Sequence, residues 1–379
     1  MPYYRWAMVR KKGLYYYAEN DLPFVVAEHK GPRSLGGAAT NYHMVDVTYC
    51  GKQLDFAMFH GFCDGLGLNR LIEATLYHYM RLKDGKEYDD TGIVTAKIPY
   101  DDAETFDPFL TKVAADTKEL KELASYEGRF HLPELDKPTD DGPTMTRLPL
   151  RIKTEDFIAW CKANGASPAA GVSAIMAKGV ANEHTINEGK IMAVLPASMR
   201  KYLNADKTFK NCSIAFFIPM PVDDVNRLSA GELATEARKI MKAQMNDHMA
   251  NLLFAGINMV IYLGKVMPTF NLKTKIMAMG ENKPQDTFIV DYVGGLAAHG
   301  YEDQITEVRY LNPSASMWST AVLMSETAGY FHVNFNQTYD TDRYYNAFCA
   351  VLDEQGIPYE KLPRDTYLNP AVDMPQKQR

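Results

Sequence analysis

The stretch FAMFHGFCDGLGLNRLIEATLYHYM, Phe56 to Met80, decides how this chain is interpreted. Its first residues continue a run from Gln53 in which large apolar side chains alternate with others, the pattern of a largely buried β-strand. From Leu68 onward, apolar side chains recur every three or four residues, which predicts an amphipathic helix that ends near Gly85. The segment between them, HGFCDG from His60 to Gly65, places a histidine directly after the strand and an aspartate before the helix.

His60 is the candidate catalytic residue. A histidine at the end of a strand can point into a cleft while a rigid element holds it. Its neutral imidazole can take a proton from a hydroxyl or an amine near pH 7. Asp64 can anchor the turn, and its charge can orient nearby groups. With nine histidines in the chain, about 0.04 chance matches to His-x-x-x-Asp-Gly are expected, so a purely structural histidine is the less favoured interpretation.

Two other chemistries compete for the same segment. Cys63 lies three residues from His60 and could act as a nucleophile, although a small buried cysteine is the commoner case. His60 and Asp64 could also be metal ligands, but no nearby cluster completes a set. We therefore expect neither a cysteine nucleophile nor a metal site.

Composition excludes several classes of protein. The chain has 379 residues, 46% of them hydrophobic and 23% charged, which fits a globular protein long enough for two domains. A net charge of -6 leaves no excess of cations for nucleic acid. Five scattered cysteines without a CxxC pair indicate a reducing compartment. No secretory signal and no run of about 18 apolar residues is present. We expect a cytoplasmic protein without a membrane span.

The chain divides into two lobes of mixed α and β structure, an α+β fold of two-layer lobes. Prolines, acids and a glycine gather between Gly128 and Pro149, the composition of an exposed connection. We expect an N-terminal lobe over residues 1–130, a linker over 131–145, a C-terminal lobe over 146–362 and a loosely ordered tail over 363–379.

Periodicity and capping residues predict the remaining elements. Ser167 with Pro168, and Ser229 with Glu232, are typical of helix starts. We expect a helix from Pro168 to about His184, one after Ser229, and one opened by Thr341. Further helices are expected over Ile257–Met267 and Leu272–Met279, and strands over His43–Tyr49, Gln53–Phe59, Lys190–Pro196, Cys212–Pro219, Thr287–Tyr292, Ile305–Leu311, Met317–Ser325 and Tyr330–Asn336.

HGFCDG between a strand and a helix resembles the HxxxDG motif of the superfamily that contains chloramphenicol acetyltransferases, plant BAHD acyltransferases and peptide-synthetase condensation domains. The wider text around it is most similar to bacterial alcohol-acetyltransferase-like proteins. Condensation domains carry a second histidine just before the first, where this chain has Phe59. The resemblance therefore favours an enzyme that uses a CoA thioester over one fed by a carrier protein.

Other blocks follow the family's order. KIMAVLPASMRKYL resembles a strand that ends in proline and is followed by an arginine, which makes Arg200 the expected partner of Asp64. Asn211, in FKNCSIAFF, resembles an asparagine that precedes the next strand. VDYVGGL partly matches the family's DFGWG block, retaining Asp291 and Gly295 near the channel. The candidate donors for an oxyanion are backbone N–H groups around Gly65 and the side chains of Ser316 and Asn336.

The resemblance implies two similar lobes around a central channel. Relatives have several dozen residues before the text that MPYYRWAMVRKKGLYYY resembles, so the N-terminal lobe is expected to lack a first strand and helix. Acyl-CoA, a co-substrate and not a bound cofactor, would meet a small alcohol or amine acceptor at His60. The implied activity is acyl transfer without an acyl-enzyme. A non-catalytic ligand-binding relative and a carrier-protein-dependent condensing enzyme are the alternatives.

Overall fold

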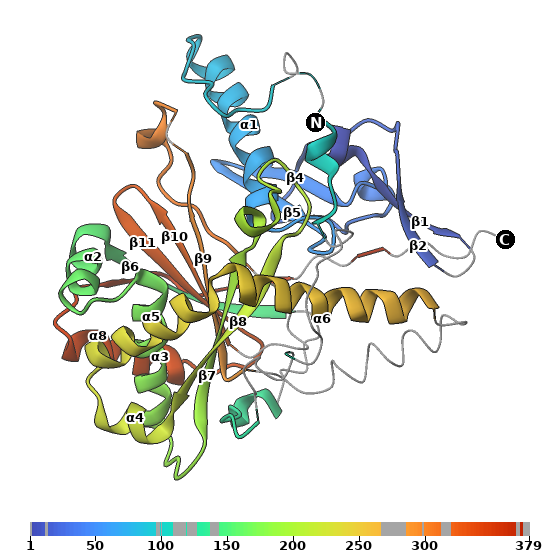
Figure 1. The fold of residues 1–379 in the computed structure, drawn as a ribbon. Coiled ribbons are helices and arrows are strands. Elements are labelled where there is room, and N and C mark those ends of the chain that lie inside the picture. The colour runs from blue at the N-terminus through green and yellow to red at the C-terminus, as the bar shows by residue number, and fades with distance from the viewer. Residues whose placement is uncertain are drawn as a thin grey trace.

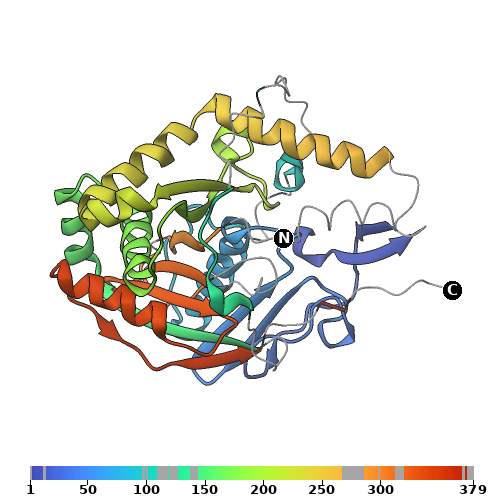
Figure 2. The ribbon, with the colours of Figure 1, turned by 90° about the horizontal axis from the view of Figure 1, so that it is seen from below.

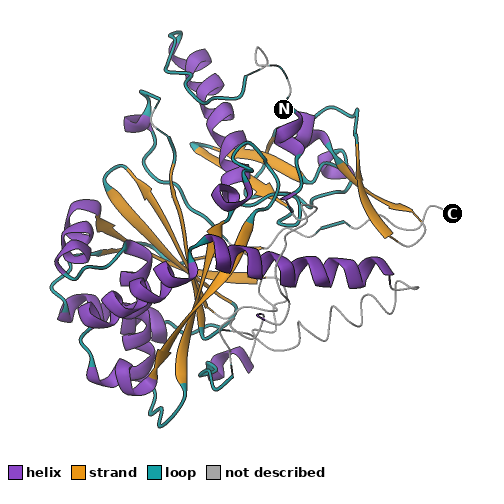
Figure 3. Cartoon of the chain, in the orientation of Figure 1, coloured by secondary structure: helices purple, strands orange, loops and turns teal. Residues whose placement is uncertain are grey.

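The computed structural model describes residues 2–11, 14–95, 99, 101–108, 119, 127–136, 144–266, 286–297, 299–311, 320–368 and 372–373. Within these ranges the chain has a mixed α/β fold of two unequal lobes (Figure 1). The smaller lobe holds the N-terminal elements, and the larger one is built on a single wide sheet. Figure 3 separates the helices from the strands of both lobes.

The N-terminal lobe consists of small sheets and one long helix. β1 (Ala7–Lys11) and β2 (Leu14–Ala18) form an antiparallel hairpin. β3 (Ala27–Glu28), β4 (Val45–Cys50) and β5 (Gln53–Met58) form a three-stranded sheet in that order. The helix α1 (Gly65–Asp84) follows β5. These elements confirm the strand, turn and helix predicted around HGFCDG.

The C-terminal lobe is built on a sheet with the strand order β12-β6-β11-β10-β9-β7-β8. β9 pairs in parallel with both β7 and β10, whereas the other neighbours in the sheet are antiparallel. The strands are β6 (Thr144–Lys153), β7 (Lys190–Ser198), β8 (Ser213–Pro221), β9 (Phe288–Gly295), β10 (Thr320–Thr327), β11 (Tyr330–Gln337) and β12 (Glu360–Lys361), with β13 (Asp365–Leu368) also paired to β6.

Helices cover one face of this sheet, and the other face turns toward the N-terminal lobe (Figures 1 and 2). The covering helices are α2 (Thr154–Ala163), α3 (Pro168–Glu183), α4 (Val222–Arg227), α5 (Ala230–Gln244) and α8 (Arg343–Glu354). α6 (Asp247–Val266) instead crosses toward the smaller lobe. β11 shows the consequence of this layering, because Phe331, Val333 and Phe335 join the main hydrophobic core beneath the helices. The alternate residues of β11 face the other way.

Most elements beyond the linker are confirmed. β7, β8, β9 and β11 lie within two or three residues of the expected strands. The capping box of Ser229 and Glu232 opens α5. Ser167 stands at the N-cap of α3 and Pro168 begins the helix, although the Ser167 side chain makes no capping hydrogen bond. The last helix begins at Arg343, and the strand expected over Met317–Ser325 is described from Thr320 onward.

Ile305–Leu311 is not a strand, so that prediction is wrong. β10 is already paired along both edges, by β9 and β11. The segment lies instead against the face of the sheet, where the Ser325 hydroxyl donates to the carbonyl of Val308. Ile305, Val308 and Tyr310 are half-buried there and Leu311 is exposed, so the segment packs on the sheet without strand pairing.

Three boundary predictions also need correction. The helix expected over Ile257–Met267 begins ten residues earlier, at Asp247. The connection expected over 131–145 overlaps structured residues at both ends, because Leu132 is fully buried and β6 begins at Thr144. Leu272–Met279 lies outside the described residues.

The tail expected to be loosely ordered over 363–379 contains a strand. β13 pairs with β6, and Asp365 forms an ion pair with Arg147. Farther along, Val372 makes a parallel bridge to Leu35 of the N-terminal lobe. The end of the chain therefore contacts both lobes, which a search for periodic patterns in a short charged segment does not detect.

Candidate active site

His60 lies in the turn that joins β5 to α1, and its side chain is exposed. Asn211, which precedes β8 in the other lobe, contacts it: the Asn211 amide nitrogen lies 3.2 Å from His60 Nδ1 and 3.2 Å from the His60 carbonyl oxygen. The backbone N–H of Ser213 donates to Asn211 Oδ1 over 2.9 Å, so the amide nitrogen is the atom that faces the histidine. In this arrangement Nδ1 is an acceptor and the ring proton is on Nε2.

Asp64 begins α1 and is buried, with 3% of the residue exposed. It is the N-cap residue, and its Oδ1 accepts from the N–H of Gly67 over 2.9 Å. Its Oδ2 accepts from the N–H of Cys212, also over 2.9 Å. A carboxylate at a helix N-terminus is favoured both by the free N–H groups and by the helix dipole. Asp64 thus fixes the start of α1 against the other lobe.

Arg200 completes this anchor, as the sequence predicted. Its two terminal nitrogens lie 2.7 Å from the two oxygens of Asp64, a bidentate pair between the lobes. The remaining guanidinium hydrogens donate to the carbonyls of Thr208 and Lys210 and to the Ser198 hydroxyl. Burial lowers the pKa of Arg200, but its hydrogen bonds and attraction to Asp64 outweigh this and raise it above the usual value. The Arg200 guanidinium is therefore charged, and both oxygens of the Asp64 carboxylate are hydrogen-bonded.

The first turn of α1 packs tightly against the C-terminal lobe. A Cβ added to Gly67 would lie 2.2 Å from the carbonyl oxygen of Phe209, so only glycine allows this approach. Gly65 is less constrained, because its added Cβ would meet the Val293 side chain at 3.0 Å. On the other side, the Tyr3 and Tyr4 hydroxyls donate to the carbonyls of Phe62 and Gly67.

Asp291 approaches the site from β9, on the face of the sheet that turns toward the N-terminal lobe. It is half-buried. Burial raises the pKa of Asp291 to about 6, attraction to His60 opposes this rise, and repulsion from Asp64 adds to it. A carboxyl with this pKa changes charge in the same pH range as an ordinary imidazole. Asp291 therefore lies within electrostatic reach of His60.

A cavity of about 690 Å³ lies beside the first turns of α1 and borders Arg200. Arg70 and Lys201 bring cations to it, and Glu73 and Asp206 bring acids. Its remaining lining residues are Leu66, Asn69, Ser198, Thr208, Gly295, Leu296 and Ala297. The cavity thus draws on both lobes, next to the segment that carries His60.

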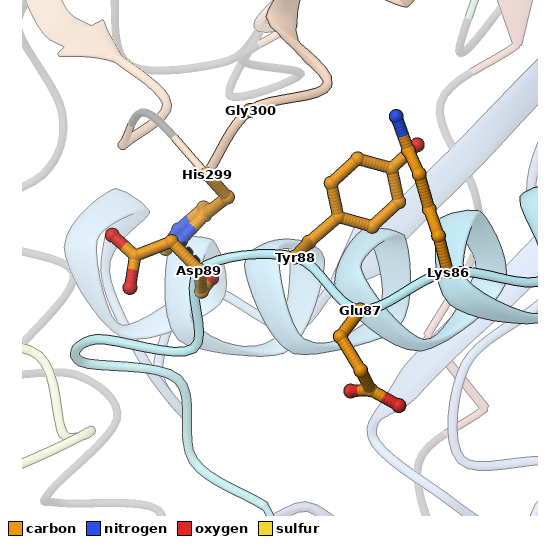
Figure 4. Close-up of a pocket in the computed structure, with 6 residues that line it drawn as sticks. All are labelled: Lys86, Glu87, Tyr88, Asp89, His299 and Gly300. Atoms are coloured by element: carbon orange, nitrogen blue, oxygen red, sulfur yellow. Dashed lines mark hydrogen bonds between the residues drawn. The ribbon is translucent and has the colours of Figure 1, made fainter.

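A second hollow, of about 460 Å³, lies at the opposite end of α1 (Figure 4). It is lined by Lys86, Glu87, Tyr88, Asp89, His299 and Gly300. Figure 4 shows His299 against Asp89, whose carbonyl oxygen lies 3.0 Å from His299 Nδ1. Since α1 has 20 residues, roughly 30 Å of helix separates this hollow from His60. It is not part of the site around His60.

The other candidate residues differ in how they relate to the site around His60. Gly295 lines the cavity and approaches the carbonyl of Glu326. Asn336 is buried, with its amide nitrogen donating to Asn334 and its oxygen accepting from Tyr367, so it is engaged within the sheet. Ser316 lies outside the described residues. Burial strongly raises the pKa of Cys63, which disfavours a thiolate nucleophile. Among the residues described, no group of three metal-ligating side chains exists.

Several contacts of the site had no usable sequence signal. The N–H of Cys212 and the carbonyls of Thr208 and Lys210 are backbone groups, which any residue type could supply. The hydroxyl of Tyr310 donates to Asn69 of α1 over 2.9 Å, joining the segment after η8 (Glu302–Gln304) to the smaller lobe. The aromatic residues Tyr3 and Tyr4 near the N-terminus support the turn that carries His60 through their hydrogen bonds to Phe62 and Gly67.

Comparison with solved structures identifies the fold. The epimerization domain from the third module of tyrocidine synthetase B is similar over 93% of this chain and 85% of its own, at 10% identity and a TM-score of 0.56. Polyketide synthase associated protein 5 from Mycobacterium tuberculosis is similar over 93% of this chain and 86% of its own, at 11% identity and a TM-score of 0.59. F. graminearum TRI101, complexed with coenzyme A and T-2 mycotoxin, is similar over 94% of this chain and 88% of its own, at 11% identity and a TM-score of 0.56.

These likenesses show a fold of the condensation-domain and chloramphenicol-acetyltransferase type over most of the chain. No protein-family model matches the sequence, and no curated protein is significantly similar to it. Within the described ranges, every helix is too short or too polar to cross a membrane.

Proposed function

We propose that this protein is an acyltransferase that moves an acyl group, in the simplest case acetyl, from a CoA thioester to an alcohol or amine. The observation that carries the proposal is the opposite treatment of His60 and Asp64. The carboxylate is buried and fixed to Arg200 across the two lobes, and the imidazole is left exposed. This arrangement positions a base without burying it.

In the proposed reaction the acceptor loses its proton to His60 as its oxygen or nitrogen attacks the thioester carbonyl. The tetrahedral intermediate then collapses, the carbon–sulfur bond breaks, and the CoA sulfur takes the proton from the imidazolium. No bond to the enzyme forms. For Nε2 to accept this proton, the ring must change to its other tautomer, with its own proton on Nδ1, and give up the hydrogen bond from Asn211 to that atom. The Asn211 amide then keeps its hydrogen bond to the His60 carbonyl oxygen.

The N-terminus of α1 supplies positive potential where negative charge develops. Asp64 accepts from the N–H of Gly67, and the N–H groups of Gly65 and Leu66 precede it in the first turn, where no helical carbonyl is available to them. Donors of this kind stabilise an oxyanion by about 2.7–4 kcal/mol when aligned. We assign this task to the backbone of the first turn, in preference to the engaged amide of Asn336.

The cavity beside α1 is the proposed binding site for the CoA donor. Arg70 and Lys201 provide cations for its phosphates, and the cavity borders the turn that carries His60. The acceptor would reach His60 through a channel between the lobes. All five cysteines are unpaired, which supports a reducing compartment, and we place the protein in the cytoplasm.

The deciding experiment measures thiol release from acetyl-CoA in the presence of a panel of alcohols and amines. We expect sustained, acceptor-dependent release that falls about 10²–10⁴-fold in His60→Ala, with an unchanged circular dichroism spectrum. Tight binding of acetyl-CoA without release would instead identify a ligand-binding module. Release only from a phosphopantetheinylated carrier protein would identify a condensing enzyme, and either result would reject the proposal.

A further inference from the structure

The face of β11 that turns toward the N-terminal lobe is polar. His332, Asn334 and Asn336 alternate with the core residues of the same strand, and all three are buried. Pairing places Asn334 opposite Leu323 of β10, and Leu323 opposite Asp291 of β9. Asn334 of β11 therefore lies on the same face of the sheet as Asp291 of β9, with β10 between the two strands.

Two of these residues have no hydrogen-bond partner for their side chains. Within the described part of the chain, neither Nδ2 nor Oδ1 of Asn334 is hydrogen-bonded. The ring nitrogens of His332 also lack a hydrogen bond, although Nδ1 lies 3.8 Å from a carboxylate oxygen of Glu307. The exposed fractions of the two residues are 1% and 2%. Asn336 on the same strand differs, because it bonds to Tyr367 and to the backbone of Asn334. Burying polar atoms without partners costs stability, and a bound ligand can repay that cost.

The surroundings indicate which ligand fits. The nearby cations are already paired, Arg147 with Asp365 and Arg309 with Glu307. Burial lowers the pKa of His332, so its imidazole is neutral and offers one donor and one acceptor. Asn334 also offers a donor and an acceptor. A neutral group with both functions is complementary to them. A carboxylate or phosphate is not, because among the described residues the cations near His332, which include Arg151 with its partner Glu360, are already paired.

We propose that Asn334 and His332 form a binding site for a carboxamide group, through reciprocal hydrogen bonds between the Asn334 amide and the amide of the ligand. The site shares a sheet face with Asp291, which interacts with the charge of His60. The bound carboxamide would therefore belong to the acceptor. That last identification rests on the proposed function, whereas amide binding itself does not.

The first test compares stability in the absence of ligand. Asn334→Leu removes two unpartnered polar atoms from the interior and is expected to leave the thermal midpoint unchanged or to raise it. Asn336→Leu, on the same strand and face, removes two hydrogen bonds and is expected to lower the midpoint by several degrees. If Asn334→Leu lowers it as much as the control, Asn334 is satisfied within the protein and the proposal is wrong.

The second test uses acetamide as the probe and acetone, which has no N–H donor, as its match. Acetamide should perturb the amide spectrum of the parent protein saturably, and acetone should bind at least tenfold more weakly. Asn334→Leu should weaken acetamide binding by a similar factor, and Asn336→Leu and His60→Ala should retain it. Absence of saturable binding in the parent, or equal binding in Asn334→Leu, would overturn the site. Because binding is scored in His60→Ala too, its outcome is independent of turnover.

Discussion

His60 and Asp64 stand four residues apart in one turn, yet the fold holds them in opposite ways. Asp64 is buried and accepts four hydrogen bonds, two of them from Arg200 of the other lobe. His60 is exposed, and a single side chain, Asn211, contacts its ring among the hydrogen bonds of the described residues. The difference teaches that Asp64 serves to hold the two lobes together, whereas His60 is left accessible for the proton transfer that we propose. Substitutions at its two ends should therefore have separable effects.

Loss of the Asp64 carboxylate should have the largest effect on stability. Asp64→Ala leaves the Arg200 guanidinium buried without its counter-ion, and we expect the free energy of unfolding to fall by about 3–5 kcal/mol. Urea denaturation measures it. Glu236→Ala is the matched control, because it breaks an exposed pair with Lys239 and should cost less than about 1 kcal/mol. Equal losses in both variants would show that the pair between the lobes contributes nothing special.

A substitution at Asp291 tests how burial and the neighbouring residues His60 and Asp64 affect this carboxyl. Burial raises the pKa of Asp291 from 3.8 to about 6, so the folded protein holds this proton more tightly than the unfolded chain. Below about pH 4 the carboxyl is protonated in both states, between about pH 4 and 6 a penalty develops, and above about pH 6 it is complete. Asp291→Asn should therefore increase the free energy of unfolding by about 1–3 kcal/mol at neutral pH.

The same variant should have no such advantage at about pH 4, which provides the internal control. Urea titrations of the parent and Asp291→Asn at the two pH values measure the difference. An advantage of equal size at both would mean that the carboxyl has an ordinary pKa, and that neither His60 nor Asp64 acts on it in the way described.

A substitution at Gly67 tests the close contact between the first turn of α1 and the C-terminal lobe. In Gly67→Ala the new methyl group would meet the Phe209 carbonyl at 2.2 Å, and a displacement of this kind costs about 1–3 kcal/mol. Gly65→Ala is the control, because it meets only the movable Val293 side chain and gains helix propensity of up to about 1 kcal/mol. Thermal denaturation of both should place Gly67→Ala well below Gly65→Ala, and the reverse order would contradict the packing.

Loss of the Asn211 side chain should have the smallest effect, and we expect it in the rate of acyl transfer and not in stability. Asn211→Ala removes its contacts to the Nδ1 atom and the carbonyl of His60, and one such hydrogen bond is worth about 0.5–1.5 kcal/mol. We expect kcat/KM for acyl transfer to fall about 3–10-fold while the thermal midpoint changes little. A large loss of stability with unchanged kcat/KM would show that Asn211 serves the lobe contact instead.

Local pattern predicted the part of the fold that carries the site. The helix after Asp64 buries a regular stripe, and Leu54, Phe56 and Met58 of the strand before His60 pack partly buried against the same core, so periodicity was sufficient. Arg200 lies far along the chain from Asp64, and only the family resemblance connected them. The strand predicted over Ile305–Leu311 was wrong because β-branched and aromatic residues are also found in a segment that packs against the face of a sheet without pairing at its edge.

Other features could not be predicted because backbone atoms carry them. The N–H of Cys212 and the carbonyl of Phe209 shape the turn regardless of their side chains. The unpartnered side chains of Asn334 and His332 are visible only once the faces of β11 are known. In sequence, HVNFN is an ordinary alternating strand whose polar positions would be assigned to solvent.

The central claim is that the His60 imidazole takes the proton of the acceptor. The most direct test compares kcat/KM for acyl transfer in the parent, in His60→Ala, and in His60→Ala supplied with free imidazole. We predict a loss of about 10²–10⁴-fold, unchanged thermal stability, and partial recovery with imidazole, since the position is open to solvent. A rate in His60→Ala equal to that of the parent would contradict the account.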